Sequence, residues 1–283
     1  MPNVLPTTEY LESLWAKAPK DVLKIDTSML YGEESKYITV RFDEAKFPKQ
    51  IEIVHITDVQ FGHRSCNVKK FIEYRDWILS KKNRFVFFGG DMVDAATALS
   101  IASPYENTEE PQGQVYRFVE LAMPMRHRVI GYVGGNHERR GVKTFGDLGK
   151  LIAMLLKVPY SSGKQFVDVY YGQHRPYRNS LWHGGTGSRT KGAKAQMIHR
   201  FMTQGDSDCY WVGHLHDTML IGDVRSARDG KKNIKAEKFR GVMSSSFLEH
   251  WGTYAEVAGM PIGSTEMWRL ILEPTGHSEL TLR

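Results

Sequence analysis

The stretch Ile51-Glu-Ile-Val-His-Ile-Thr-Asp-Val-Gln60 is an apolar run followed at once by side chains that can bind metal. Its first half is rich in β-branched residues, which is typical of a buried strand. A carboxylate, Asp58, and an amide, Gln60, stand where that strand is expected to end. Because binding sites in α/β sheets collect beyond the carboxyl ends of strands, this stretch predicts a core strand that carries functional groups at its end.

Three later segments repeat this arrangement of an apolar run followed by ligand-type residues. They are Gly90-Asp91-Met-Val-Asp94, Gly135-Asn136-His137-Glu138 and Gly213-His214-Leu-His216. Carboxylate, amide and imidazole groups together suit a divalent ion such as manganese, iron or zinc. One such aspartate alone is more often a turn residue or a helix N-cap. Four segments of this kind, each after a strand, favour one shared metal site.

A fifth candidate ligand, His183, rests mainly on its place at the end of the short strand-like run 180–182. The glycine-rich stretch 184–192 that follows lacks the lysine of a phosphate-binding P-loop, so it is interpreted as a flexible basic loop. Within it, Arg189 is a candidate contact for a substrate phosphate. Arg139, which comes after the Asn136-His137 pair, is a second such candidate. For each arginine, a solvated surface position is the competing interpretation.

Composition sets the broad class of protein. The chain has 283 residues, 41% hydrophobic and 25% charged, which is ordinary for a globular protein. It contains no apolar run of the roughly 18 residues that a membrane span needs, and its first residues do not resemble a signal peptide. Two cysteines fit a reducing compartment, so we expect a cytoplasmic protein without a membrane partner. The net charge of +6 indicates an anionic partner such as nucleic acid, although a solvated basic surface would give the same value.

The order of predicted elements indicates an α/β fold with one mixed sheet or two packed sheets. Strands alternate with helices as far as residue 156, with helices expected at 68–79, 95–101, 115–123 and 145–156, and short strands follow. Residues 229–238 are strongly polar and are expected to form a surface loop. Residues 1–50 are interpreted as an N-terminal appendage to a domain formed by 51–283. That appendage could cap the site, pair with a sheet edge or mediate self-association.

From Asp58 to His216, these motifs resemble the calcineurin-like metallophosphoesterase superfamily. The stretch from His55 to Gly62 is similar to nuclease-type members, and the tail 246–261 is similar to phage-encoded ones. The resemblance implies a four-layer αββα sandwich of two mixed sheets flanked by helices. It also implies metal-dependent hydrolysis of phosphoesters, here as a phosphodiesterase or nuclease acting on nucleic acid or nucleotides. The alternatives are a small-molecule phosphomonoesterase, a nucleotide pyrophosphatase and a non-catalytic binding scaffold.

The same resemblance implies two divalent ions, with manganese expected and iron or zinc as alternatives. Asp91 would bridge both ions, and the other ligands would divide between the two sites. The first site would hold Asp58, Gln60 and His216; the second would hold Asn136, His183 and His214. Two such ions would generate a hydroxide by lowering the pKa of a shared water from 15.7 toward about 7.

Two further features of the implied site concern proton transfer and metal affinity. His137 would lie beside the scissile phosphate without binding metal, and Asp94 would hold its ring in place. Gln60 stands where family members usually carry histidine. Because an amide oxygen is a weaker donor than imidazole toward zinc or iron, we expect a weakened first site.

Overall fold

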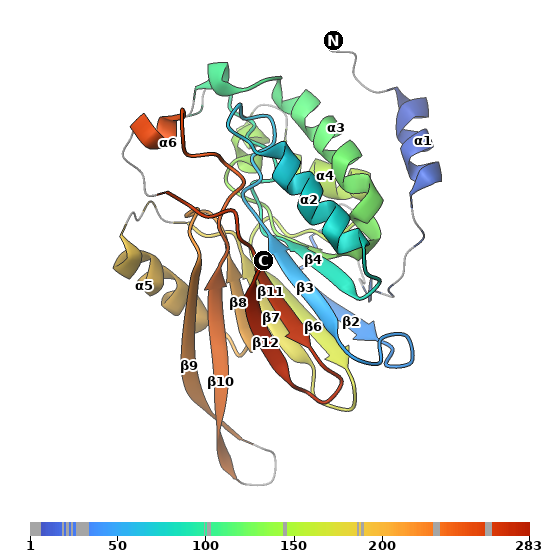
Figure 1. Ribbon diagram of the computed structural model, residues 1–283, viewed down its shortest axis with the longest axis vertical. Helices are drawn as coiled ribbons and strands as arrows, with labels where there is room; N and C mark the ends of the chain where they lie inside the picture. Colours follow the sequence, from blue (N-terminus) through green and yellow to red (C-terminus); the bar gives the residue numbers. More distant parts are fainter. Residues whose placement is uncertain are drawn as a thin grey trace.

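The computed structural model describes residues 7–18, 20, 23, 25–26, 34–98, 100, 103–143, 146–185, 187, 190–228, 233–257 and 262–283. Their architecture is two β-sheets packed face to face, with helices on the outer face of each (Figure 1). This is the four-layer sandwich of mixed sheets that the motifs implied. Among the described residues, no helix combines the length and the apolar character needed to cross a bilayer.

The smaller sheet has five strands, and its centre is parallel. Its order is β12 (Ser278–Leu282), β11 (Trp268–Leu272), β3 (Ile51–Ile56), β4 (Arg84–Phe88) and β5 (Val129–Tyr132). Strands β3, β4 and β5 pair in parallel, so their carboxyl ends lie along one edge. Every residue of β3 and β4 is buried, as expected for parallel strands covered on both faces.

The larger sheet has seven strands. Its order is β1 (Ile25–Asp26), β2 (Tyr37–Phe42), β6 (Gln165–Tyr171), β7 (Tyr177–Trp182), β8 (Cys209–Val212), β10 (Ile234–Met243) and β9 (Met219–Arg228). Strands β7, β8 and β10 are parallel to one another, whereas β9 and β10 form a long antiparallel hairpin. The carboxyl ends of β7 and β8 therefore lie at a common edge of this sheet.

Three apolar clusters separate the layers. Alternate residues of β3 and β4 belong to two of these clusters. Ile53 and Phe85 face the other sheet, whereas Val54 and Val86 face the helices. The helical layer over the smaller sheet contains α2 (Val68–Leu79), α3 (Pro111–Ala122) and α4 (Leu148–Leu156). A single helix, α5 (Lys191–Met202), packs on the outer face of the larger sheet. Short helices complete the described elements: η1 (Pro104–Glu106), η2 (Met123–Arg128), η3 (Glu138–Lys143) and α6 (Tyr254–Val257).

Parts of the N-terminal segment 1–50 belong to these layers. Strand β2 extends the larger sheet by pairing in parallel with β6, and its residues Ile38 and Val40 are fully buried. Helix α1 (Thr8–Lys17) lies on the helical layer, where the Trp15 indole donates a hydrogen bond to the Leu155 carbonyl at 2.7 Å. Of the three roles considered for this segment, pairing with a sheet edge is the one that β2 performs. The division of the chain into domains at residue 50 stays a prediction.

Two local expectations are wrong, and both have a physical reason. The helix expected at 95–101 is absent from the described residues of that range. There Ala95 is left-handed, with φ of 52°, and its N–H donates to the buried Gln114 side chain at 2.8 Å. The loop expected at 229–238 is too long, because β10 already begins at Ile234 and pairs with Arg228. Both hairpin strands are largely exposed near that turn, so their polar sequence carries no strand-like alternation.

Candidate metal centre

Five strand ends from the two sheets meet at one place. Asp58, Asp91 and Asn136 follow β3, β4 and β5, and His183 and His214 follow β7 and β8. Ligand atoms of Asp91, His183 and His214 all lie within 4.8 Å of one another. Residues that are up to 156 positions apart in the sequence thus lie in one cluster.

The backbone at the predicted ligands is unusual. Seven non-glycine residues of the described chain have a clearly positive φ, and five of them are predicted ligands. These five are Asp58, Gln60, Asp91, His214 and His216, with φ between 47° and 70°. A left-handed conformation is unfavourable for such residues and persists where the surrounding structure imposes it, often at functional sites. Each turn aims its side chain off the strand end into the cluster.

One half of the cluster contains the ligands predicted for the second metal site. It is organised around Asp91 and His183, both buried. His183 Nδ1 donates to the Gly89 carbonyl at 2.7 Å, which leaves Nε2 as the nitrogen available to a metal. That Nε2 atom lies 3.0 Å from Asp91 Oδ2 and 3.1 Å from Asn136 Oδ1. Three of the atoms assigned to metal binding therefore already face one another.

The other half of the cluster contains the ligands predicted for the first metal site. It is organised around Asp58, which is fully buried. Its Oδ2 atom accepts hydrogen bonds from the Thr57 hydroxyl at 2.6 Å and from the His214 N–H at 2.8 Å. Its Oδ1 atom lies 3.1 Å from His216 Nε2. Gln60 completes this side, since its Nε2 atom lies 3.3 Å from His216 Nε2. All of the predicted ligands of the first site thus lie together.

The donor set fits a divalent cation. Asp58 Oδ1 and Asp91 Oδ2 are buried, and the Nε2 atoms of His216 and His183 lie 3.1 Å and 3.0 Å from them, but neither contact has the geometry of a hydrogen bond. Such buried oxygens are costly unless a cation satisfies them. Burial by itself would lower the pKa of His183, but the carboxylates of Asp91 and Asp58 raise it to about 10. The same histidine and its neighbours outweigh burial and lower the pKa of both aspartates. The cluster therefore carries surplus negative charge and favours positive charge at its centre.

His137 lies beside this cluster. Its Nδ1 atom is 2.9 Å from Asp94 Oδ1, and its Nε2 atom is 3.6 Å from Asp91 Oδ2. Burial raises the pKa of Asp94, but His137 and then Arg140 lower it below its usual value. Asp94 is therefore the ionised partner that the expected orientation of His137 requires.

Arg140, the neighbour of the predicted contact Arg139, lies at this site. Its guanidinium donates to the Asp94 carbonyl at 2.7 Å and lies 3.0 Å from His137 Nε2. Arg139, the residue predicted to contact substrate, is an exposed residue of the same 3-10 turn, η3. The other predicted contact, Arg189, lies outside the described residues. Two adjacent arginines give no sequence signal of which one faces inward, because that depends on the turn between them.

Glu138, which directly follows the candidate His137 in the sequence, is fully buried. Its carboxylate accepts hydrogen bonds from the N–H groups of Asp91, Met92 and Gly135 at 2.7–3.0 Å. Burial and then the charge of Asp91 raise its pKa to about 8. Glu138 thus ties the ends of β4 and β5 together, and the only sequence signal was a carboxylate directly after the candidate His137.

Gly135 explains why the two strand ends can approach so closely. A Cβ atom at this position would lie 2.0 Å from Asp91 Oδ1 and 2.3 Å from the Asp91 nitrogen. No residue with a side chain fits there without movement of the backbone that carries Asp91. The glycine is therefore part of the geometry of the centre.

Comparison with known proteins adds a likeness of fold. No family model matches the chain, and no curated protein matches it in sequence. It is similar to the structure of a metallophosphoesterase from Sphaerobacter thermophilus, with 15% identity over 83% of this chain and 87% of that one and a TM-score of 0.41. A conserved uncharacterised protein of Streptococcus pneumoniae, described as a predicted phosphoesterase, gives 15% identity over 83% and 98% and a TM-score of 0.35. Zinc-bound Vps29 of Entamoeba histolytica gives 13% identity over 82% and 98%, also at 0.35. At these identities the likeness concerns the fold alone.

Proposed function

We propose that this protein is a metal-dependent phosphoesterase of the calcineurin-like superfamily, and that it acts as a phosphodiesterase or nuclease. The observation that carries the proposal is the convergence of Asp58, Asp91 and His183 with the histidines 214 and 216, while His137 stands beside them. A scaffold that only binds metal has no use for His137, an oriented histidine that lies next to the ligands without being one of them.

The residues divide into holding and reacting groups. Asp58, Gln60 and His216 would hold one divalent ion, Asn136, His183 and His214 a second, and Asp91 would contact both. Bound ions of this kind supply Lewis acidity, which offsets phosphoryl charge and makes water a stronger nucleophile near neutral pH.

The remaining groups act on the substrate directly. Because His137 Nδ1 faces the Asp94 carboxylate, its Nε2 is the atom directed toward the reacting centre. A proton at Nε2 can be passed to the leaving oxygen of the phosphoester, so the P–O bond breaks without release of a free alkoxide. The Arg140 guanidinium, 3.0 Å from that nitrogen, can only donate, so it would turn from Nε2 to a phosphoryl oxygen on the same side when Nε2 carries its proton.

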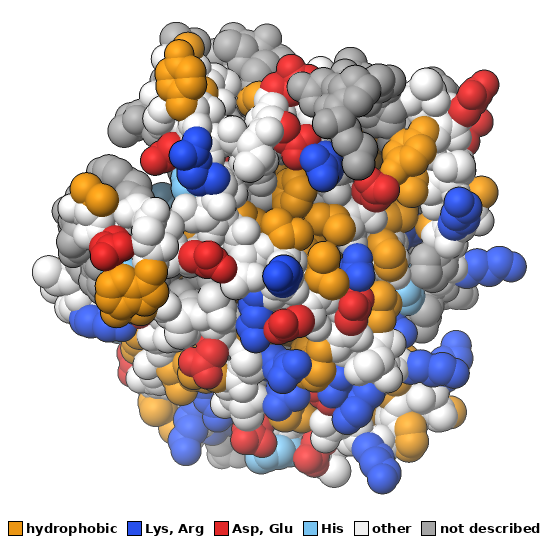
Figure 2. Space-filling view, turned by 45° about the horizontal axis from the view of Figure 1, so that its top comes forward, with side chains coloured by type: hydrophobic (Ala, Val, Ile, Leu, Met, Phe, Trp, Pro, Cys, Tyr) orange, Lys and Arg blue, Asp and Glu red, His pale blue; other side chains and the backbone are white. Residues whose placement is uncertain are grey.

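A diester substrate is favoured by the resemblance of the stretch from His55 to Gly62 to nuclease-type members, and by the net charge of +6. The charge is not gathered into a single basic surface on the face that Figure 2 shows, where acidic and hydrophobic side chains lie between the lysines and arginines. We therefore expect substrate choice to depend more on contacts at the centre, such as Arg140, than on a long electrostatic groove.

The test is hydrolysis of bis-p-nitrophenyl phosphate, its monoester and labelled DNA and RNA, each with manganese, zinc or iron. We expect turnover of the diesters, lost on chelation and restored by metal. His137→Ala should lower kcat by about 100-fold or more while metal stays bound. Asp91→Asn should weaken metal binding itself. Bound metal without hydrolysis of any substrate would contradict the proposal and favour a binding scaffold, and faster cleavage of the monoester would favour a phosphatase.

A further inference from the structure

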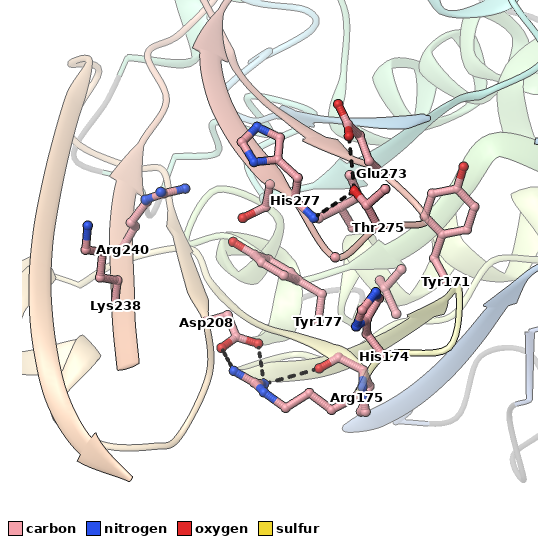
Figure 3. Close-up of a pocket in the computed structure, with 15 residues that line it drawn as sticks. Tyr171, His174, Arg175, Tyr177, Asp208, Lys238, Arg240, Glu273, Thr275 and His277 are labelled. Carbon is pink, nitrogen blue, oxygen red and sulfur yellow. Dashed lines mark hydrogen bonds and ion pairs between the residues drawn. The ribbon is translucent and has the colours of Figure 1, made fainter. Parts of the chain in front are cut away.

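A pocket lies at the opposite end of the sandwich from the metal centre. It opens between the β6–β7 turn, the β11–β12 turn and strand β10, and has a volume of about 360 Å³ (Figure 3). Tyr177 begins β7, and His183 follows its end. Six residues of extended chain at about 3.3 Å each place the two sites ~20 Å apart, too far for one small ligand to occupy both.

The walls of this pocket are held by contacts within the protein. Arg175 donates to both oxygens of Asp208, at 2.7 Å and 2.9 Å, and this pair is therefore internally neutral. The β6–β7 and β11–β12 turns touch each other, because a Cβ atom at Gly172 would lie 2.2 Å from the Pro274 carbonyl oxygen. Across the β11–β12 turn, the Thr275 hydroxyl donates to Glu273 at 3.1 Å. The cavity is thus built by packed turns and a paired arginine.

Two cations, Lys238 and Arg240, line the pocket from one strand. They are two positions apart on β10, so they lie on the same face of that strand (Figure 3). Neither makes an ion pair with a carboxylate among the residues that the structure describes. Of the charged groups in the lining, three are basic and two acidic, and the Arg175–Asp208 pair cancels. The remaining charged groups of the lining are the two cations Lys238 and Arg240 and the single carboxylate of Glu273.

The rest of the lining supplies aromatic surface and hydrogen-bond donors. The half-buried Tyr177 forms part of the wall, and the imidazoles of His174 and His277 stand at the exposed rim. Tyr171 also lines the pocket, but its ring is packed in the core and is only 6% exposed. Guanidinium and ammonium groups bind phosphate, the first through two parallel hydrogen bonds and the second as a point charge. Aromatic side chains offer stacking surface to a planar base. The volume lies within the range of about 300–1,000 Å³ typical of small-ligand sites.

We propose that this pocket binds a small phosphomonoester that carries a planar ring, such as a nucleoside monophosphate, with its phosphate between Lys238 and Arg240. The ring lies against the tyrosine and histidine side chains. The site is separate from the metal centre, and the proposal does not depend on hydrolytic activity there.

The experiment is isothermal titration calorimetry on the full chain without added metal, with adenosine monophosphate, adenosine and inorganic phosphate as probes. We expect the monophosphate to bind more tightly than either of its parts. Lys238→Glu, at an exposed position, should weaken its binding by about 10- to 100-fold, and Arg240→Gln should act in the same direction.

Two control variants show whether the ligand occupies this pocket. Lys235→Glu changes a lysine on the same strand outside the pocket, and Arg140→Ala changes the metal centre; both should leave the dissociation constant within about twofold. Absence of monophosphate binding would overturn the proposal. So would an equal loss in Lys235→Glu, which would indicate non-specific charge, or a loss confined to Arg140→Ala, which would place the ligand at the metal centre. Unchanged binding in folded Lys238→Glu would refute it as well.

Discussion

Replacement of Gly135 by alanine tests whether the close approach of β4 and β5 is what assembles the centre. The new Cβ atom would lie 2.0 Å from Asp91 Oδ1 and 2.3 Å from the Asp91 nitrogen, whereas real Cβ contacts essentially never fall below 3.0 Å. The strand ends must therefore separate by about 1 Å, the difference between 3.0 Å and 2.0 Å. Overpacking of this kind typically costs about 1–3 kcal/mol.

The same movement stretches hydrogen bonds that hold Asp91. The Glu138 carboxylate joins the N–H groups of Asp91 and Gly135 at 2.9 Å and 3.0 Å, and the His137 N–H donates to Asp91 at 2.8 Å. Weakening two of these three bonds adds roughly 1–3 kcal/mol. We expect Gly135→Ala to lower the free energy of unfolding by about 2–6 kcal/mol in total. A displacement of about 1 Å at the reacting centre should also lower kcat by ~100-fold.

The assays are urea denaturation, calorimetric titration with manganese and diester hydrolysis. Gly222→Ala is the matched control, because a Cβ atom at Gly222 in β9 meets nothing within 4 Å. A Gly135→Ala protein that keeps the stability, the manganese affinity and the turnover of the Gly222→Ala protein would show that the close approach is not needed.

Four further outcomes are expected. Gln60→His should tighten the first metal site, seen as a higher manganese or zinc content after dialysis; an unchanged content would show that this side chain does not limit affinity. Asp94→Asn should lower kcat by about 100-fold with metal binding intact, because His137 loses its orienting carboxylate; a parallel fall in metal content would contradict this. Removing metal should lower the melting temperature, since an ion at 100 times its Kd contributes about 2.7 kcal/mol; equal melting curves with and without chelator would exclude tight binding. Burial raises the pKa of Asp217, but Lys191 and Lys194 lower it below the usual 3.8, so its stabilising contribution should be present above pH 3.8 and disappear as the pH falls through the lower, folded-state value. In denaturant titrations, the stability difference between wild type and Asp217→Asn should therefore shrink toward pH 3, and a constant difference would be evidence against the ion pair.

Much of the fold was predictable because it follows from local pattern. The buried runs 51–56 and 85–88 predict β3 and β4, since a short run of six or four apolar-rich residues is typical of a strand covered on both faces. The polar residues directly after them identify the strand ends that carry ligands. The order of these motifs along the chain was enough to predict one shared cluster, because parallel strands bring their carboxyl ends to a common edge.

The amino-acid sequence by itself determined which residue types stand at the strand ends, and with them the kind of ion that the centre can hold. Only the tertiary structure decided that Arg140 contacts His137, that Glu138 bridges β4 and β5, and that β2 joins the larger sheet. Each of these depends on the path of a turn or on pairing between distant strands. Such contacts are set by the relative positions of separate elements, and no periodicity within a single segment encodes them.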